Sequence, residues 1–369
     1  KKALIFYIFL GGHFHAANAI EKGLQETVKD VQVEKVDALS YTNPVLKKIL
    51  DKAYMRVIKK HPDIWGNMYD NPEVLKKITK ARAALHKFNM SKMKKLLESH
   101  SPDVILCTQA FPCGMVAEYK QSSGCKVSLI GVLTDYAPHS YWLHDEVDLY
   151  VAPSEETARV LMEKGVSPKK VKVCGIPVDP KFKHKTDTSL IRKEMGFSKE
   201  DPVILIMGGS QGLGAVEDVV KSLLKDIRHN YQLVVVAGSN KKLFNRLKKI
   251  EASRQGENIR ILSFVENTDR LMDMSDIIIT KAGGMTIAEA MGKSLPVLIV
   301  DPIPGQEVMN ADYLTRQGAA IHVKTPEDIH RKINELFDSN NMLIEMKKIA
   351  GELSKPDSAL DIAKLAFGE

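Results

Sequence analysis

The sequence predicts an α/β protein of two domains. Its 369 residues suffice for two domains of ordinary size. Short apolar runs rich in β-branched residues, typical of buried parallel strands, alternate with stretches of helical spacing. The alternation stops in a segment rich in proline and lysine, residues 175–187, and then starts again. Two alternating halves joined by a linker indicate two Rossmann-like domains that face one another.

The first half contains six predicted strands. They cover residues 3–10, 31–38, 103–107, 126–133, 149–152 and 171–174. After the first strand, a turn at Gly11-Gly12-His13 leads into a helix over residues 14–29. Ser154 is placed to cap the helix that follows the fifth strand. Residues 44–100 are expected to be helical. The first domain is therefore predicted to cover residues 1–180.

The second half contains five predicted strands, at residues 203–207, 233–237, 259–262, 276–280 and 296–300. The first of them ends in a glycine-rich turn, residues 208–214, before a helix that starts at Ala215. This turn is weak evidence of a phosphate site, because Ala215 replaces the P-loop lysine and the order is not Gly-x-Gly-x-x-Gly. The second domain is predicted to cover residues 181–355, and residues 356–369 to form a helix that crosses back to the first domain.

The composition, 44% hydrophobic and 27% charged, is that of a soluble globular protein. No apolar run approaches the roughly 18 residues that a membrane span needs. The apolar N-terminal strand lacks the small-residue cleavage site of a signal peptide. The four cysteines lack metal-ligand spacing, so we expect them to be reduced and cytosolic.

Positive charge is concentrated in one window. Residues 47–96 contain 14 Lys and Arg against 4 Asp and Glu, whereas the whole chain has a net charge of +7. Lysines beside exposed aromatic and methionine side chains suit an anionic membrane surface. A solvated basic helix is the alternative, and nucleic acid is not expected, because no nucleic-acid motif accompanies the charge. The residues expected at the membrane are Lys59, Lys60, Trp65, Met68 and Tyr69.

The most informative stretch begins at the strand over residues 276–280. It ends in Ala282-Gly283-Gly284, and helical spacing follows, with Thr286 in the first turn. A strand, a glycine turn and an exposed helix N-terminus together form a site for an anion. Glu289 lies one turn inside this helix, where a carboxylate could reach a ribose diol. An ordinary βαβ unit is the alternative, but the stiff, polar loop 302–307 after the next strand favours a ligand site.

Two ionisable residues of the first half are candidate general bases. Asp135 follows the strand over residues 126–133, and His13 follows the first strand, where an α/β sheet places its chemistry. Helix capping is the alternative role for Asp135, and capping of a turn is the alternative for His13.

The pattern Gly-Gly-x-Thr-x-x-Glu followed by Pro-x-Pro-Gly-Gln-Glu-x-x-Asn, from Gly283 to Asn310, resembles the donor-nucleotide site of one glycosyltransferase family. That family comprises processive diacylglycerol glucosyltransferases and monogalactosyldiacylglycerol synthases. The Gly-His-x-x-Ala-Ala element at Gly12 and the Thr-Asp…His…Trp run at Thr134 are similar too, so the resemblance covers nearly the whole chain, with gaps. One departure is Phe9-Leu10, where the family has a small-residue, glycine-rich lead-in.

The resemblance implies a glycosyltransferase of the GT-B type, with two Rossmann-like domains facing across a cleft. It implies transfer of a hexose from a uridine-diphosphate (UDP) donor to diacylglycerol or its glycosylated product, with inversion at the anomeric carbon. Asp135 is then the first candidate base and His13 the second. The backbone of Phe264 and Val265 would pair with uracil, Glu289 with ribose, and Gln306 and Glu307 with the sugar. The other residues expected at the donor are Gly12, Gly209, Ser210, Gly283, Gly284, Met285, Thr286 and Asn310, and those expected near the acceptor are His139 and Trp142.

The chain contains no Asp-x-Asp pair, so neither a metal nor another cofactor is expected, and the helix N-terminus would stabilise the diphosphate. The expected location is peripheral, on the cytoplasmic face of the membrane. One alternative is the related peptidoglycan N-acetylglucosaminyltransferase, although the Pro-Ile-Pro-Gly-Gln-Glu loop fits it less well. Another is a non-catalytic lipid- or nucleotide-binding protein. The sequence does not choose between glucose and galactose, nor give the number of sugars or the oligomeric state.

Overall fold

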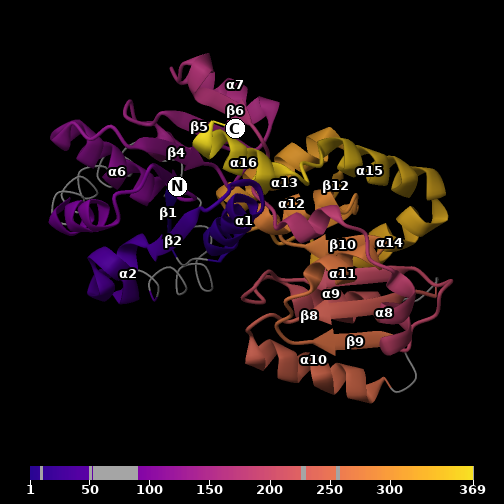
Figure 1. The fold of residues 1–369 in the computed structure, drawn as a ribbon. Coiled ribbons are helices and arrows are strands. Elements are labelled where there is room, and N and C mark those ends of the chain that lie inside the picture. Colours follow the sequence, from indigo (N-terminus) through magenta and orange to yellow (C-terminus); the bar gives the residue numbers. More distant parts are fainter. Residues whose placement is uncertain (9–10, 50–51, 53–89, 226–229, 255–257, 369) are drawn as a thin grey trace. The chain divides into compact units, whose positions relative to one another are not determined.

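A computed structural model describes residues 1–8, 11–49, 52, 90–225, 230–254 and 258–368. It divides into two compact units. The first consists of Lys1–Pro180, Pro304–Gln306 and Asp357–Glu369, and the second of Lys181–Ile303 and Glu307–Pro356. Each unit is built on one six-stranded sheet in which all paired strands are parallel (Figure 1). The expectation of two Rossmann-like domains is confirmed.

In the first unit the strand order is β2-β1-β3-β4-β5-β6. Because the order reverses between β1 and β3, the carboxyl ends of these two strands form the switch point at which open α/β sheets bind ligands. The strands are β1 (Lys2–Tyr7), β2 (Gln32–Asp37), β3 (Val104–Cys107), β4 (Ser128–Val132), β5 (Leu149–Ala152) and β6 (Val171–Val173). The helices are α1 (Gly12–Thr27), α2 (Ala38–Thr42), α6 (Ala110–Ser123), α7 (Glu155–Glu163) and α16 (Ser358–Phe367).

In the second unit the order is β12-β11-β10-β7-β8-β9. Counted from β7, this is the Rossmann order 3-2-1-4-5-6, and its switch point lies between β7 and β10. The strands are β7 (Val203–Met207), β8 (Gln232–Val236), β9 (Ile259–Leu262), β10 (Ile277–Thr280), β11 (Val297–Val300) and β12 (Ala320–Val323). The helices are α8 (Thr188–Glu194), α9 (Val216–Leu223), α10 (Lys241–Ser253), α11 (Thr268–Asp273), α12 (Gly284–Gly292), α13 (Gln306–Gln317), α14 (Ile329–Asp338) and α15 (Asn340–Leu353).

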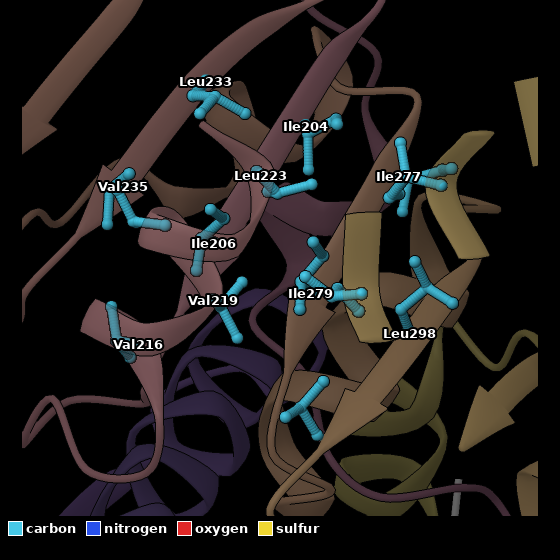
Figure 2. Packing of buried hydrophobic residues seen from close by; sticks show 14 of the residues in the cluster. Ile204, Ile206, Val216, Val219, Leu223, Leu233, Val235, Ile277, Ile279 and Leu298 are labelled. Atoms are coloured by element: carbon cyan, nitrogen blue, oxygen red, sulfur yellow. The ribbon is translucent and has the colours of Figure 1, made fainter. Parts of the chain in front are cut away.

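The core of the second unit explains why its central strands are continuous apolar runs. Every residue of β7, β8, β10 and β11 is buried, since helices cover both faces of a parallel sheet. On one face, Ile206 and Ile279 belong to the same cluster as Val219 and Leu223 of α9 (Figure 2). This packing holds the carboxyl ends of the strands in fixed register, and so fixes the loops that follow them.

Helix α16 packs against α1 in the first unit. A Cβ built on Gly23 of α1 would lie 2.3 Å from the backbone oxygen of Ala359, so only glycine permits this approach. Ile362 and Ala363 are buried in one cluster with Ile20 of α1. The end of the chain thereby completes the core of the first unit.

The structure corrects two details of the sequence analysis. A twelfth strand, β12, was not predicted, because the exposed His322 interrupts its short apolar run at the sheet edge. Helix α1 begins at Gly12 rather than at residue 14, with Gly11 at a positive φ of 77° before it, so His13 lies in the first helical turn. The predicted cap is confirmed: the Ser154 hydroxyl accepts the N–H of Thr157 at 3.2 Å.

Candidate functional site

Two glycine turns meet at the switch point of the second unit. Met207 and Thr280 are paired neighbours at the ends of β7 and β10. The chain then turns at Gly208-Gly209 after β7 and at Lys281–Gly283 after β10. A Cβ built on Gly209 would lie 3.5 Å from Cε of Lys281, and one built on Gly283 would lie 3.5 Å from its Nζ. The Lys281 side chain therefore lies beside both turns.

Helix α12 presents an uncapped N-terminus at this place. Its cap residue Gly283 supplies no side-chain hydrogen bond. Gly284, Met285 and Thr286 form the first turn, whose N–H groups and positive helix end favour an anion. Glu289 lies in the next turn and is partly buried. The structure thus places these predicted donor residues on one short helix at the carboxyl edge of the sheet.

The loop after β11 supplies the next predicted residues. Glu307 forms an ion pair with Lys281, and its Oε2 accepts the N–H of Ile303 at 2.9 Å. Asn310 is fully buried, and its Nδ2 donates to the backbone oxygen of Ala282 at 3.1 Å. Asn310 thereby fixes the turn before α12, while its predicted contact with the donor stays a prediction.

Sequence reasoning missed Lys281 and Asp301. Asp301 follows β11 with a φ of 51°, a conformation unusual for a residue other than glycine. Partial burial and the nearby charge of Asp218 raise the pKa of the Asp301 carboxyl. Both missed residues directly follow a buried strand of the predicted set. That position was the signal in the sequence that could have identified them.

The remaining predicted donor residues follow β7 and β9, at the same edge. Gly209 has a φ of 69° and Ser210 is partly buried. Phe264 is 49% exposed and Val265 partly buried in the loop after β9. Gly212 must be glycine for a structural reason. Its φ is 56°, and a Cβ there would lie 2.0 Å from the backbone oxygen of Ala237.

At the switch point of the first unit, His13 is held by two threonines. Thr108, after β3, donates from its hydroxyl to the backbone oxygen of His13 at 3.0 Å. Thr134, after β4, has its Oγ1 3.1 Å from Nδ1 of His13. Gly12 begins the helix that carries the imidazole. His13 is thus held, at its backbone and at its ring, by residues that follow adjacent strands.

Burial sets the charge of this imidazole. It lowers the pKa of His13 to about 4, although a hydrogen bond to the backbone of Thr108 acts in the opposite direction. His13 is therefore neutral at neutral pH and keeps a lone pair on one ring nitrogen. A neutral imidazole is the form that can accept a proton.

Asp135 follows Thr134 and is partly buried. Its Oδ2 accepts from Nε2 of Gln306 at 3.2 Å, with Gln306 in the short stretch that belongs to the first unit. The next helical turn begins only at Ser140, which disfavours helix capping as the role of Asp135. The position of this carboxylate, directly after a strand, suits a base.

The two residues predicted near the acceptor, Trp142 and His139, lie close to each other in the first unit. Trp142 is 5% exposed and belongs to the hydrophobic core of the first unit, and the His139 ring lies 6.3 Å from it. Their contact with an acceptor stays a prediction. The predicted membrane residues lie outside the described residues: Lys59, Lys60, Trp65, Met68 and Tyr69.

In the part of the chain that the structure describes, no three His, Cys, Asp or Glu side chains are grouped so that they could hold a metal ion. No helix there combines the length and the apolar character required to cross a membrane.

Two Rossmann-like units in one chain are the architecture of the GT-B fold, and solved structures agree with it. MurG from Acinetobacter baumannii matches with a TM-score of 0.68 at 18% identity, over 100% of both chains. MnaA from S. aureus, in a co-structure with UDP, matches with a TM-score of 0.67 at 16% identity, over 99% of this chain and 95% of that one. These likenesses establish the fold.

Sequence comparison establishes the family. Residues 13–178 match the monogalactosyldiacylglycerol (MGDG) synthase family, and residues 203–363 match the glycosyltransferase family 28 C-terminal domain. A processive diacylglycerol beta-glucosyltransferase from Bacillus cytotoxicus is 31% identical over 373 residues, covering 100% of this chain and 94% of that protein. One from Bacillus cereus strain AH187 is 30% identical with the same coverage. The chain belongs to this family of diacylglycerol glycosyltransferases, and the resemblance seen in the sequence is confirmed.

Proposed function

We propose that this glycosyltransferase moves a hexose from a UDP-sugar to diacylglycerol, with inversion at the anomeric carbon, and can extend the glycolipid product. The observation that carries the proposal is the similarity over the whole chain to processive diacylglycerol beta-glucosyltransferases. The two family matches, which together cover both units, support it.

The reaction requires a base in the first unit. The bond between C1 of the hexose and the diphosphate oxygen breaks, and a bond from C1 to the acceptor oxygen forms on the opposite face. The proton of the acceptor hydroxyl passes to the base. Asp135, a carboxylate after β4, takes this role in our proposal. His13, neutral because of its lowered pKa, is the second candidate.

The second unit supplies the donor site in this proposal. The N–H groups of Gly284–Thr286 and the positive end of α12 meet the diphosphate, so no metal is required there. Glu289 accepts from the ribose hydroxyls, the backbone of Phe264 and Val265 pairs with uracil, and Glu307 meets the hexose together with Gln306, from the short stretch that belongs to the first unit. The common position of these residues at the carboxyl edge of one sheet supports the assignment.

A lipid acceptor requires the enzyme to work at a membrane surface, and we place it on the cytoplasmic face. Val45 and Ile49 are exposed by 70% and 59%, and they lie four residues apart in the helical stretch of residues 44–49. A spacing of four places side chains on one helical face. These apolar side chains lie at the beginning of the basic window of residues 47–96, and the combination supports docking on anionic lipid.

A panel of donors and acceptors tests the proposal. Purified protein is incubated with labelled UDP-glucose, UDP-galactose or UDP-N-acetylglucosamine, and with diacylglycerol or a polyprenyl-linked muramoyl peptide in mixed micelles. We expect hexosyl diacylglycerol, in unchanged yield when a chelator is present, and the lengths of the products give the number of sugars. Product only on the polyprenyl acceptor would identify the peptidoglycan reaction instead, and loss of activity with chelator would refute the metal-free mechanism.

A further inference from the structure

A lysine at the donor site of the second unit has no role in the mechanism so far. Lys281 directly follows β10, and its side chain is only 15% exposed. Its Cε and Nζ lie 3.5 Å from Cβ atoms built on Gly209 and Gly283 respectively. Because glycine has no side chain, nothing at these two positions separates the ammonium group from a ligand in the turns. The ammonium therefore lies beside the uncapped end of α12.

Glu307 is the partner of this ammonium. Its Oε1 forms the ion pair with Lys281, and its side chain is 13% exposed. Its Oε2 accepts the N–H of Ile303 at 2.9 Å, which anchors the carboxylate to the loop after β11. Lysine, in contrast, is a point charge on a flexible four-carbon stem. The carboxylate is thus the fixed partner of the pair, and the ammonium is the partner that can turn towards another anion.

We propose that Lys281 neutralises the diphosphate of the donor, and that Glu307 holds the lysine in place until the donor binds. This inference rests on the proposed function, because the anion is that of a nucleoside diphosphate. A diphosphate carries more charge than one carboxylate and offers several acceptor oxygens, so it competes for the ammonium at short range. When the bond from C1 to the diphosphate breaks, the same ammonium stabilises the negative charge on the leaving oxygen.

The competing explanation is that the ion pair only holds the loop. A loop-holding pair would affect every ligand of the site equally, whereas a contact with phosphate affects only ligands that carry phosphate. Uridine and UDP differ in this respect alone. The ratio of their affinities therefore separates the two explanations.

Calorimetry with UDP and with uridine on the full chain tests the proposal. Lys281→Met keeps the length of the side chain and removes the charge. We expect it to weaken UDP binding about 10–100-fold and uridine binding less than about 3-fold, as for the loss of one charge-assisted hydrogen bond. Lys281→Arg should keep most of the preference for UDP. Glu307→Gln should bind UDP as tightly as the wild type or more tightly, because it removes the competing carboxylate.

Lys293→Met is the matched control. Lys293 follows the opposite end of α12, and its side chain, 2% exposed, is paired with Asp273 at 2.8 Å. This variant should lose stability and keep the wild-type ratio of UDP to uridine affinity. Equal losses for both ligands in Lys281→Met, or no loss for either, would overturn the role of Lys281.

The Glu307→Gln variant tests whether Glu307 competes with the diphosphate for Lys281. If it weakens UDP binding as much as Lys281→Met does, Glu307 does not compete with the diphosphate and the exchange of partners is wrong. A wild-type protein that binds uridine but not UDP would overturn the diphosphate donor together with this inference. Wild-type UDP binding with an unaltered Lys281→Met variant would overturn the inference alone.

Discussion

The two sheets of this chain use the same topological position for opposite electrostatic purposes. At the switch point of the second unit, Lys281 and Glu307 carry full charges beside two glycine turns. At the switch point of the first unit, burial keeps His13 neutral between Thr108 and Thr134. The parallel sheet fixes where loops converge, and the residue that follows each strand decides which chemistry occurs there.

The difference corresponds to the two halves of the proposed reaction. A departing diphosphate gains negative charge, so its site needs positive potential. An acceptor hydroxyl loses a proton, so its site needs a proton acceptor and no fixed positive charge. Substitutions at the two switch points should therefore have separable effects on donor binding and on turnover.

The largest expected effect is on turnover, from the first unit. Asp135→Asn keeps the size of the side chain and removes its ability to take a proton. We expect turnover to fall about 10²–10⁴-fold, as for the loss of a general base, with UDP affinity unchanged. Steady-state rates with diacylglycerol micelles, together with calorimetry on UDP, measure both quantities.

His13→Ala provides the comparison for this variant. If His13→Ala abolishes turnover and Asp135→Asn is mild, then His13 is the base and the order of the two candidates is reversed. If Asp135→Asn weakens UDP binding and leaves turnover intact, the division of chemistry between the two switch points is wrong.

The second effect is a pH-dependent loss of stability in the first unit. The pKa of His13 is about 4 in the folded protein and about 6.5 when unfolded. Between these values the unfolded chain binds more protons, so stability falls as the pH drops through this window. The loss is at most about 3.5 kcal/mol, at about 1.4 kcal/mol per pKa unit. Urea unfolding, followed by tryptophan fluorescence between about pH 7 and 4, measures it.

Two variants show whether His13 causes this loss of stability. His13→Gln should remove this part of the pH dependence. His322→Gln, at an exposed position of the second unit, should leave it unaltered. If the stability of wild type and of His13→Gln depends on pH in the same way, the neutral imidazole of His13 is not the cause of the loss.

The third effect concerns the ribose. Glu289→Ala should weaken nucleotide binding by about 1.5–3 kcal/mol, because a charge-assisted hydrogen bond is lost. Uridine and UDP should lose affinity equally, in contrast to Lys281→Met. Glu352→Ala, at a position of α15 with a side chain 62% exposed, is the control. Unaltered UDP affinity in Glu289→Ala would remove Glu289 from the donor site.

Much of the fold could be predicted from the sequence, because buried parallel strands are continuous apolar runs. This signal identified β7 and β10, whose residues are all buried. It failed for β12, where only the first and last residues are buried. Motif spacing identified the region of the donor helix, but not the ion pair of Lys281 and Glu307. That contact joins loops after two different strands, and only the strand order brings them together.

The smallest expected effect is on membrane binding, and it again compares the two units. Val45→Ser with Ile49→Ser removes two exposed apolar side chains of the first unit. Leu190→Ser removes one that is equally exposed, 59%, in the second unit. The double variant should bind anionic vesicles about 5–10-fold more weakly, or about 1 kcal/mol, because partial insertion of two aliphatic side chains is lost. Leu190→Ser should bind as the wild type does.

Cosedimentation with vesicles of increasing anionic content, at low and high salt, measures these affinities. The salt-sensitive part should come from lysines such as Lys59 and Lys60, each contributing about 1 kcal/mol near the surface, since salt shortens the range of charge attraction. The part that resists salt should fall in Val45→Ser with Ile49→Ser and in Trp65→Ala. Equal losses in Leu190→Ser would mean that exposed apolar area in general, and not this face of the first unit, determines binding. Equal binding to neutral and anionic vesicles would leave the basic window without its proposed role, and the lipid acceptor would then reach the enzyme through another surface.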